Sequence, residues 1–101
     1  MNESKLSREA ILRELKNHFS QFERLYGVTK IGIFGSAARD ELHQNSDIDI
    51  VVEMREPDLF YLVHIKEELE KDFNRHVDII RYRDKMNRYL KARIDREARY
   101  A

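Results

Sequence analysis

The stretch Lys30–Glu53, K-I-G-I-F-G-S-A-A-R-D-E-L-H-Q-N-S-D-I-D-I-V-V-E, decides the fold of this sequence. Two apolar runs, Ile31–Phe34 and Ile48–Val52, flank a connection that begins with Gly35 and Ser36. Short apolar runs bounded by turn-forming residues are typical of buried strands. The stretch therefore predicts two adjacent strands whose connection carries the polar residues of interest.

The second apolar run opens with two carboxylates, Asp47 and Asp49. Residues i and i+2 of a strand point to the same face, with Cα atoms about 6.5–7 Å apart. Two carboxylates at this spacing can jointly hold a hard divalent cation, which prefers oxygen ligands. A third carboxylate, Asp78, interrupts the later apolar run Arg75–Arg81, where its desolvation is costly unless something pairs with it. A cation shared by the three aspartates would supply that partner; exposure on an edge strand, or a basic neighbour, is the alternative.

After the aspartates, the Gly35-Ser36 pair is the second unusual feature of this stretch. Glycine at the end of a strand lets the backbone approach a ligand closely. If Ala37–Leu42 forms a short helix, its first amides would face an anion. A phosphate site beside a metal site predicts a nucleoside triphosphate held through its phosphates, and with it nucleotidyl transfer. Arg39 would lie one turn beyond Ser36, where it could neutralise a phosphate or pair with a carboxylate and brace the loop; bracing is favoured.

The composition is that of a small globular protein with a highly charged surface. A chain of 101 residues is expected to form one domain, residues 1–101, around a single core. The 19 basic residues balance the 19 acidic ones, which argues against an extended nucleic-acid site. The absence of cysteine excludes disulfides and thiolate metal sites. No signal peptide and no membrane-spanning apolar run are evident, so a cytoplasmic location is expected.

The periodicity of apolar residues predicts the other elements. Intervals of three and four indicate three long helices: Ser7–Tyr26, Leu59–Phe73 and Lys85–Arg99. Apolar runs indicate three strands: Lys30–Phe34, Asp47–Glu53 and Arg75–Arg81. Gly27 is expected to end the first helix, while Asp58 and Asp84 are expected to cap the last two. The order α-β-α-β-α-β-α predicts an α/β (α+β) domain with a small mixed sheet of three to four strands and helices packed on it.

Three further features are weaker indicators. His18, on the first helix, is expected to be a surface or boundary residue with a structural role. Gly32 marks either a close approach by a ligand or another backbone, or plain packing. Basic side chains are expected to form a solvated outer face on the last helix: Lys85, Arg88, Lys91, Arg93 and Arg96.

The combined spacing resembles a known family. Gly35-Ser36, ten residues, Asp47-Ile48-Asp49 and then Asp78 on a later apolar strand are similar to the signature of the polymerase-beta-like nucleotidyltransferases. The form G-S-A-A-R…S-D-I-D-I-V-V and the short chain resemble the minimal nucleotidyltransferase (MNT) group over nearly the whole length. The resemblance implies the polymerase-beta-like fold. It also implies an antitoxin paired with a HEPN-domain ribonuclease toxin, since some members transfer AMP from ATP to a toxin tyrosine.

The resemblance also implies roles for individual residues. Asp47 and Asp49 would hold two Mg²⁺ ions, and Asp78 would share one of them and help to deprotonate the acceptor hydroxyl. These three aspartates are thus the expected catalytic and metal-binding residues.

The expected nucleotide-binding residues are Gly35, Ser36 and Arg39. The first two would bind the triphosphate of ATP, and Arg39 matches a frequent family position. Many members have glycine at the next position, where this chain has Asp40, so the phosphate role of Arg39 stays open.

Chain length bears on the acceptor. Once a triphosphate and metals fill a cleft, a fold of 101 residues has little surface left for an acceptor pocket. The leading hypothesis is therefore a Mg-dependent protein adenylyltransferase that forms a hetero-oligomer with a HEPN toxin and modifies its tyrosine. The alternatives are a non-catalytic antitoxin that inhibits its partner by direct contact, and an enzyme acting on a small acceptor, which the short chain disfavours.

Overall fold

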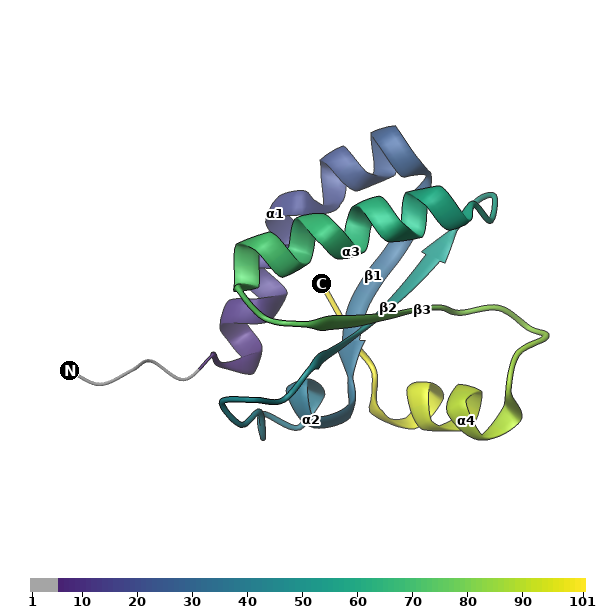
Figure 1. The fold of residues 1–101 in the computed structure, drawn as a ribbon. Helices are drawn as coiled ribbons and strands as arrows, with labels where there is room; N and C mark the ends of the chain where they lie inside the picture. The colour runs from purple at the N-terminus through teal and green to yellow at the C-terminus, as the bar shows by residue number, and fades with distance from the viewer. Residues whose placement is uncertain (1–5) are drawn as a thin grey trace.

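A four-stranded mixed sheet forms the centre of the computed structural model, which describes residues 6–101 (Figure 1). The strands are β1 (Val28–Phe34), β2 (Ile48–Met54), β3 (Val77–Arg81) and β4 (Arg99–Tyr100). Their order is β3-β2-β1-β4, and β1 pairs antiparallel with both β2 and β4 whereas β2 and β3 run parallel. The expected small mixed sheet is confirmed.

Four helices accompany the sheet: α1 (Arg8–Tyr26), α2 (Gly35–Ala38), α3 (Leu59–Phe73) and α4 (Arg88–Glu97). Figure 1 shows α1 and α3 side by side on one face of the sheet, while α4 lies on the other side. Among residues 6–101, no helix combines the length and the apolar character that crossing a membrane requires.

The two faces of the sheet bury different apolar sets. Ile48, Ile50 and Val52 of β2 belong to the larger cluster, together with buried residues of α1 and α3. Val51 points the other way and packs with Phe34 of β1 and Ile94 of α4 in a smaller cluster. This alternation follows from the two-residue period of a strand. It places the side chains of odd-numbered β2 residues, Asp49 included, on the α4 face.

Local caps set the ends of the two long helices. The Ser7 side chain accepts a hydrogen bond from the Ala10 N–H at 3.1 Å, and Gly27 ends α1 with a left-handed φ of 71°. The Asp58 side chain accepts from the first-turn amides of α3. Because serine, aspartate and glycine favour these positions, both helices have the expected bounds.

The expected last helix, Lys85–Arg99, is wrong at both ends. Asn87 rather than Asp84 caps α4, since its side chain accepts from the Leu90 N–H at 2.9 Å. After Glu97 the chain turns extended and pairs with β1, where Gly32 is the register partner of Tyr100. A Cβ at position 32 would lie 2.9 Å from the Cα of Tyr100, so this glycine permits the close approach of another backbone.

The short helix after β1 also differs from the expected Ala37–Leu42. It spans only Gly35–Ala38, because Asp40 adopts a left-handed φ of 60° that ends it. Aspartate is among the few side chains that tolerate this conformation. The Asp40 carboxylate also accepts from the backbone N–H of Arg8 at 2.9 Å. Asp40 thus takes the conformation that glycine would adopt easily and ties the loop to α1.

Candidate active site

Strand pairing brings the three predicted aspartates to one end of the sheet. Asp49 of β2 is the register partner of Asp78 in the parallel pair β2–β3, and Asp47 lies just before β2. Asp49 also pairs across the antiparallel ladder with Phe34, the last residue of β1. Because Gly35 follows Phe34 directly, the Gly-Ser connection begins beside the same carboxylate.

Gly35 and Asp49 are in direct contact. A Cβ built on Gly35 would clash with Oδ2 of Asp49 and would lie 3.2 Å from Nη2 of Arg93. The φ of Gly35 is 67°, a conformation that side chains disfavour. Glycine is therefore required here both for its backbone conformation and for the space that the carboxylate occupies.

The electrostatics also show that the acidic residues influence one another. Burial raises the pKa of the Asp49 carboxyl, and the charges of Asp78 and Asp47 raise it further. Arg93 and Arg39 act in the opposite direction without cancelling the effect. Asp49 is half-buried, whereas Asp47 and Asp78 are exposed. Asp49 is therefore a partly desolvated carboxyl with both acidic and basic side chains near it.

The donor set fits a hard divalent cation. Strand register sets Asp49 beside Asp78, Asp47 lies two residues before Asp49, and carboxylate oxygens are the ligands that Mg²⁺ prefers. The carboxylate oxygens of the three aspartates do not all lie within 4.8 Å of one another. Among residues 6–101, one ligand atom each of Glu14, His18 and Asp72 does.

Ser36 lines a cavity beside the loop that follows β1. It is half-buried, and its carbonyl accepts from the Glu41 N–H at 2.8 Å, which closes the loop. The cavity has a volume of about 570 Å³ and is lined by Ser36, Arg39, Asp40, Glu41, Leu42 and His43. Small-molecule sites commonly occupy volumes of roughly this order. The loop after β1 thus provides room for a small molecule beside Ser36 and Arg39.

Arg39 is paired with acidic side chains. Its Nε donates to Oε1 of Glu41 at 3.0 Å, and its Nη1 donates to Oε1 of Glu97 at 3.3 Å. The hydrogen bond to Glu41 and the charge of Glu97 raise the pKa of the guanidinium, which keeps it protonated. In this structure Arg39 braces the loop against α4.

Two residues of α4 join the site although the sequence did not indicate them. Oε1 of Glu97 accepts from the backbone N–H of Gly35 at 3.2 Å and lies 3.6 Å from Nε of Arg93. The guanidinium of Arg93 lies over the Phe34 ring, 5.6 Å from its centroid. Arg93 is therefore only partly solvated, with 43% of its side chain exposed, because the burial of Ile94 turns this side of α4 toward the end of β1.

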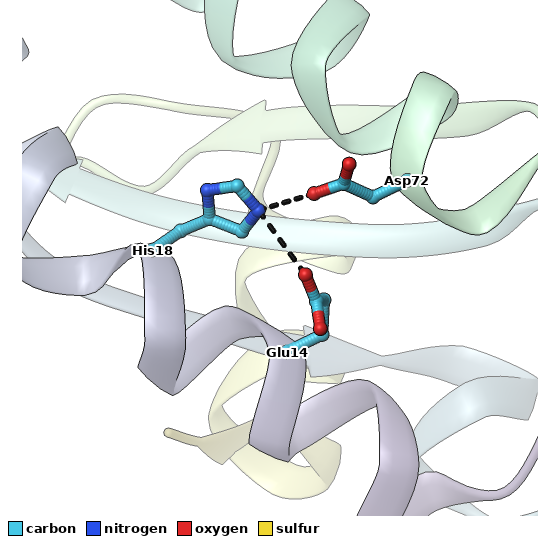
Figure 2. A group of neighbouring side chains, drawn as sticks. All are labelled: Glu14, His18 and Asp72. Atoms are coloured by element: carbon cyan, nitrogen blue, oxygen red, sulfur yellow. Dashed lines mark hydrogen bonds and ion pairs between the residues drawn. The ribbon is translucent and has the colours of Figure 1, made fainter.

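A second polar group lies between α1 and α3 (Figure 2). Nε2 of His18 contacts a carboxylate oxygen of Asp72 and lies 3.4 Å from Oε2 of Glu14. The imidazole is stacked on Phe22, with ring centroids 4.9 Å apart, and its side chain is only 15% exposed. His18 thus occupies the boundary position expected for it and ties the two helices together.

Comparison with known proteins identifies the family. A model of the nucleotidyltransferase domain matches residues 12–101. The chain belongs to the nucleotidyltransferase domain family. The match extends from α1 to the end of the chain and includes the Gly-Ser connection and all three aspartates, so this nucleotidyltransferase has the enzyme class that its signature implied.

Two curated relatives resemble this nucleotidyltransferase over most of their length. A Methanocaldococcus jannaschii protein named as a candidate protein adenylyltransferase is 40% identical over 88 residues, which cover 86% of this chain and 94% of that protein. The protein adenylyltransferase MntA of Thermococcus cleftensis is 36% identical over 76 residues, which cover 74% of this chain and 77% of MntA.

Solved structures share the fold. A structure described as a candidate minimal nucleotidyltransferase superposes with a TM-score of 0.78 at 29% identity, covering 95% of this chain and 97% of the other. A complex of a tri-AMPylated Shewanella oneidensis HEPN toxin with an MNT antitoxin gives a TM-score of 0.68 at 16% identity, covering 92% and 70%. The latter likeness concerns the fold alone.

Proposed function

We propose that this nucleotidyltransferase is the antitoxin of a toxin–antitoxin pair. It transfers AMP from ATP to a tyrosine hydroxyl of a HEPN-domain ribonuclease toxin, with Mg²⁺ bound by Asp47, Asp49 and Asp78. The names of the Thermococcus relative and of the AMPylated toxin complex support this assignment. The protein would act in the cytoplasm as a single domain bound to its toxin.

The observation that supports the proposal most strongly is the contact between Gly35 and Asp49. It places the backbone that would face the triphosphate directly against a carboxylate whose strand neighbour is Asp78. A phosphate site and a metal site must adjoin for a metal to bridge phosphate oxygens and protein. Gly35 and Ser36 would hold the triphosphate at this junction.

The reaction requires one bond to form and one to break at the α-phosphorus. The acceptor oxygen attacks the α-phosphorus of ATP, the bond to the oxygen of the departing pyrophosphate breaks, and the hydroxyl proton leaves the acceptor. Asp78 is suited to take that proton, because it is exposed and lies beside Asp49 in the register. The products are the AMP ester of the acceptor and pyrophosphate.

The aspartates would act mainly as ligands. When bound, two Mg²⁺ ions supply Lewis-acid chemistry, which favours the ionised acceptor oxygen and neutralises the charge of the departing pyrophosphate. Asp47 and Asp49 would hold these ions against the phosphates. Burial and the charges of Asp78 and Asp47 raise the pKa of Asp49, as expected of such ligands when no cation is bound.

A protein acceptor also agrees with the surface of α3 and α4. The first turn of α3 exposes Leu59 and Phe60, with 75% and 77% of their surface accessible, and Tyr89 of α4 is 81% exposed. Large apolar side chains left in water are typical of surfaces that bind another protein. A partner that covers the exposed residues of either helix could also bring the acceptor hydroxyl.

The test is mass spectrometry of the toxin after incubation with this chain, ATP and Mg²⁺. We expect a mass increase that matches one or more AMP groups, and its loss in the variant Asp47→Ala/Asp49→Ala. Removal of the metal ligands should slow transfer by about a hundredfold or more, because bound metals contribute several kcal/mol to such reactions.

A matched control removes two carboxylates elsewhere. Glu56→Ala/Glu67→Ala makes the same change in charge at exposed positions, and it should transfer AMP at the wild-type rate. If the aspartate variant protects cells from the toxin as well as wild type at equal expression, the catalytic proposal fails. The non-catalytic alternative, inhibition by direct contact, would then stand.

A further inference from the structure

The carboxylate of Glu97 occupies hydrogen-bond donors that a phosphate group would use. Its Oε1 accepts from the Gly35 N–H at 3.2 Å and from Nη1 of Arg39 at 3.3 Å, and the same atom lies 3.6 Å from Nε of Arg93. One oxygen atom therefore receives a backbone amide and faces two guanidinium groups. The Glu97 side chain is only 19% exposed, so this is a defined position and not a mobile surface contact.

Arg93 reaches the junction between the loop and the carboxylates. Its Nη2 lies 3.2 Å from the position of a Cβ on Gly35, and its charge lowers the pKa of Asp49. The guanidinium also lies over the Phe34 ring. Burial of Ile94 and the cap at Asn87 fix the backbone of α4, so Arg93 is held close to Gly35 by the fold.

The chemistry of these groups suits a polyphosphate better than a carboxylate. A guanidinium presents several N–H donors in a fork that matches phosphate oxygens, and such charge-assisted hydrogen bonds are short and strong. A triphosphate entering beside Gly35 would compete with Glu97 for the same donors. It would also repel Glu97, because both groups are anions.

We propose that Arg93 is a further nucleotide-binding residue, and that Glu97 is an internal anion which holds Arg93, Arg39 and the Gly35 amide until the triphosphate displaces it. This inference rests on the proposed function, since it names additional groups that bind the nucleotide. It assigns opposite effects to two neighbours on one helix. Arg93 favours the bound state, and Glu97 favours the free state.

The experiment measures ATP affinity by isothermal titration calorimetry, with Mg²⁺ present and no toxin. We expect Arg93→Ala to weaken ATP binding about tenfold or more, which corresponds to about 1.4 kcal/mol. Glu97→Gln keeps the size of the side chain but removes the competing charge, so it should tighten binding severalfold. Inorganic tripolyphosphate, titrated in the same way, should also bind more weakly to Arg93→Ala and more tightly to Glu97→Gln, because the contacts are to phosphates.

Two controls separate binding from structure. Arg88→Ala removes the same charge from an exposed position on α4, and it should leave ATP affinity within about twofold of wild type, since screened charges at a distance contribute little. Arg93→Lys should recover part of the affinity lost in Arg93→Ala. Thermal unfolding of each variant checks that the fold is retained.

The outcomes that overturn the inference are distinct. If Glu97→Gln weakens ATP binding as Arg93→Ala does, Glu97 merely positions the arginines. Unchanged affinity in Arg93→Ala would remove Arg93 from the nucleotide site while leaving the proposed function intact. Wild-type protein that binds no ATP would overturn both proposals, whereas binding without AMP transfer to the toxin would count against the proposed function alone.

Discussion

Two groups of acidic side chains in this molecule differ in how their charge is balanced. Between α1 and α3, the carboxylates of Glu14 and Asp72 both meet Nε2 of His18, and the three ligand atoms lie within 4.8 Å of one another. At the end of the sheet, the aspartates spread further apart and leave Asp49 with a raised pKa. In the tighter group an imidazole lies between the two carboxylates. In the looser group Arg93 and Arg39 act to lower the pKa of Asp49, but burial and the charges of Asp78 and Asp47 keep it raised.

The difference shows that close convergence of side chains is a poor guide to function. An imidazole between two carboxylates satisfies them, and its stacking on Phe22 makes it part of the packing between two helices. Asp49 and Asp78 are held beside each other by strand register, and the pKa of Asp49 stays raised although Arg93 and Arg39 act to lower it. Unbalanced charge at functional sites is common, because ligands or metals complete the balance.

Mg²⁺ and ATP should therefore stabilise the protein through the aspartates and not through the His18 group. This is the largest of the expected effects. At about a hundred times the dissociation constant, a ligand adds about 2.7 kcal/mol to stability, or on the order of 10 °C in Tm for a domain of this size. We expect such a rise with Mg²⁺ and ATP over a chelator, measured by differential scanning fluorimetry. Asp49→Asn should abolish most of it, and His18→Gln should keep it.

The opposite result would reverse the assignment of the two groups. If His18→Gln removed the response to Mg²⁺ while Asp49→Asn retained it, the group between the helices would be the metal site. Equal melting temperatures of wild type in chelator and in excess Mg²⁺ with ATP would contradict the metal assignment at the aspartates.

The His18 group should instead matter for stability, with a smaller effect. We expect His18→Gln to lower the free energy of unfolding by about 1–2 kcal/mol, because it removes a mostly buried stacked ring and weakens the contact between α1 and α3. Urea unfolding monitored by circular dichroism measures this change. His76→Gln is the matched control, since its side chain is 88% exposed and the change should cost about 0.5 kcal/mol or less. Equal losses in both variants would show that His18 does not join the helices.

Sequence reasoning succeeded where structure depends on nearby residues. The ends of α1 and α3 follow from Ser7, Gly27 and Asp58, whose side chains or backbone act within one turn of the helix. The sequence also indicated the acidic residues, because an aspartate inside an apolar run needs an explanation; their role as a site stays a prediction. Register then set Asp78 beside Asp49, which the sequence could only suggest.

The errors concern interactions between distant parts of the chain. The last helix stops at Glu97 because the following residues pair with β1 at Gly32, more than sixty positions away. Arg93 and Glu97 showed only an i, i+4 pair, which is usually a solvated ion pair on a helix surface. Their role at Gly35 depends on how α4 crosses the sheet, and no local pattern encodes that crossing.

The smallest expected effect concerns the pH dependence of the metal-free protein. The folded-state pKa of Asp49 is raised above the unfolded value of about 3.9, so folding favours its protonated form. The stability that this group contributes is fully present below that value and is lost as pH rises through the folded pKa. Asn has no proton to lose, so in chelator Asp49→Asn should melt above wild type at pH 7, by roughly 1–4 °C, and the difference should shrink toward pH 4.

A matched change isolates this effect from the general loss of negative charge. Glu67→Gln replaces an exposed acid of α3 with an amide, and its difference from wild type should stay nearly constant across the same pH range. If Asp49→Asn melted below wild type at pH 7 in chelator, the carboxylate would be stabilised by Arg93 more than it is destabilised by burial and by Asp78. The site would then resemble the balanced group between the helices, and a cation would not be needed to explain it.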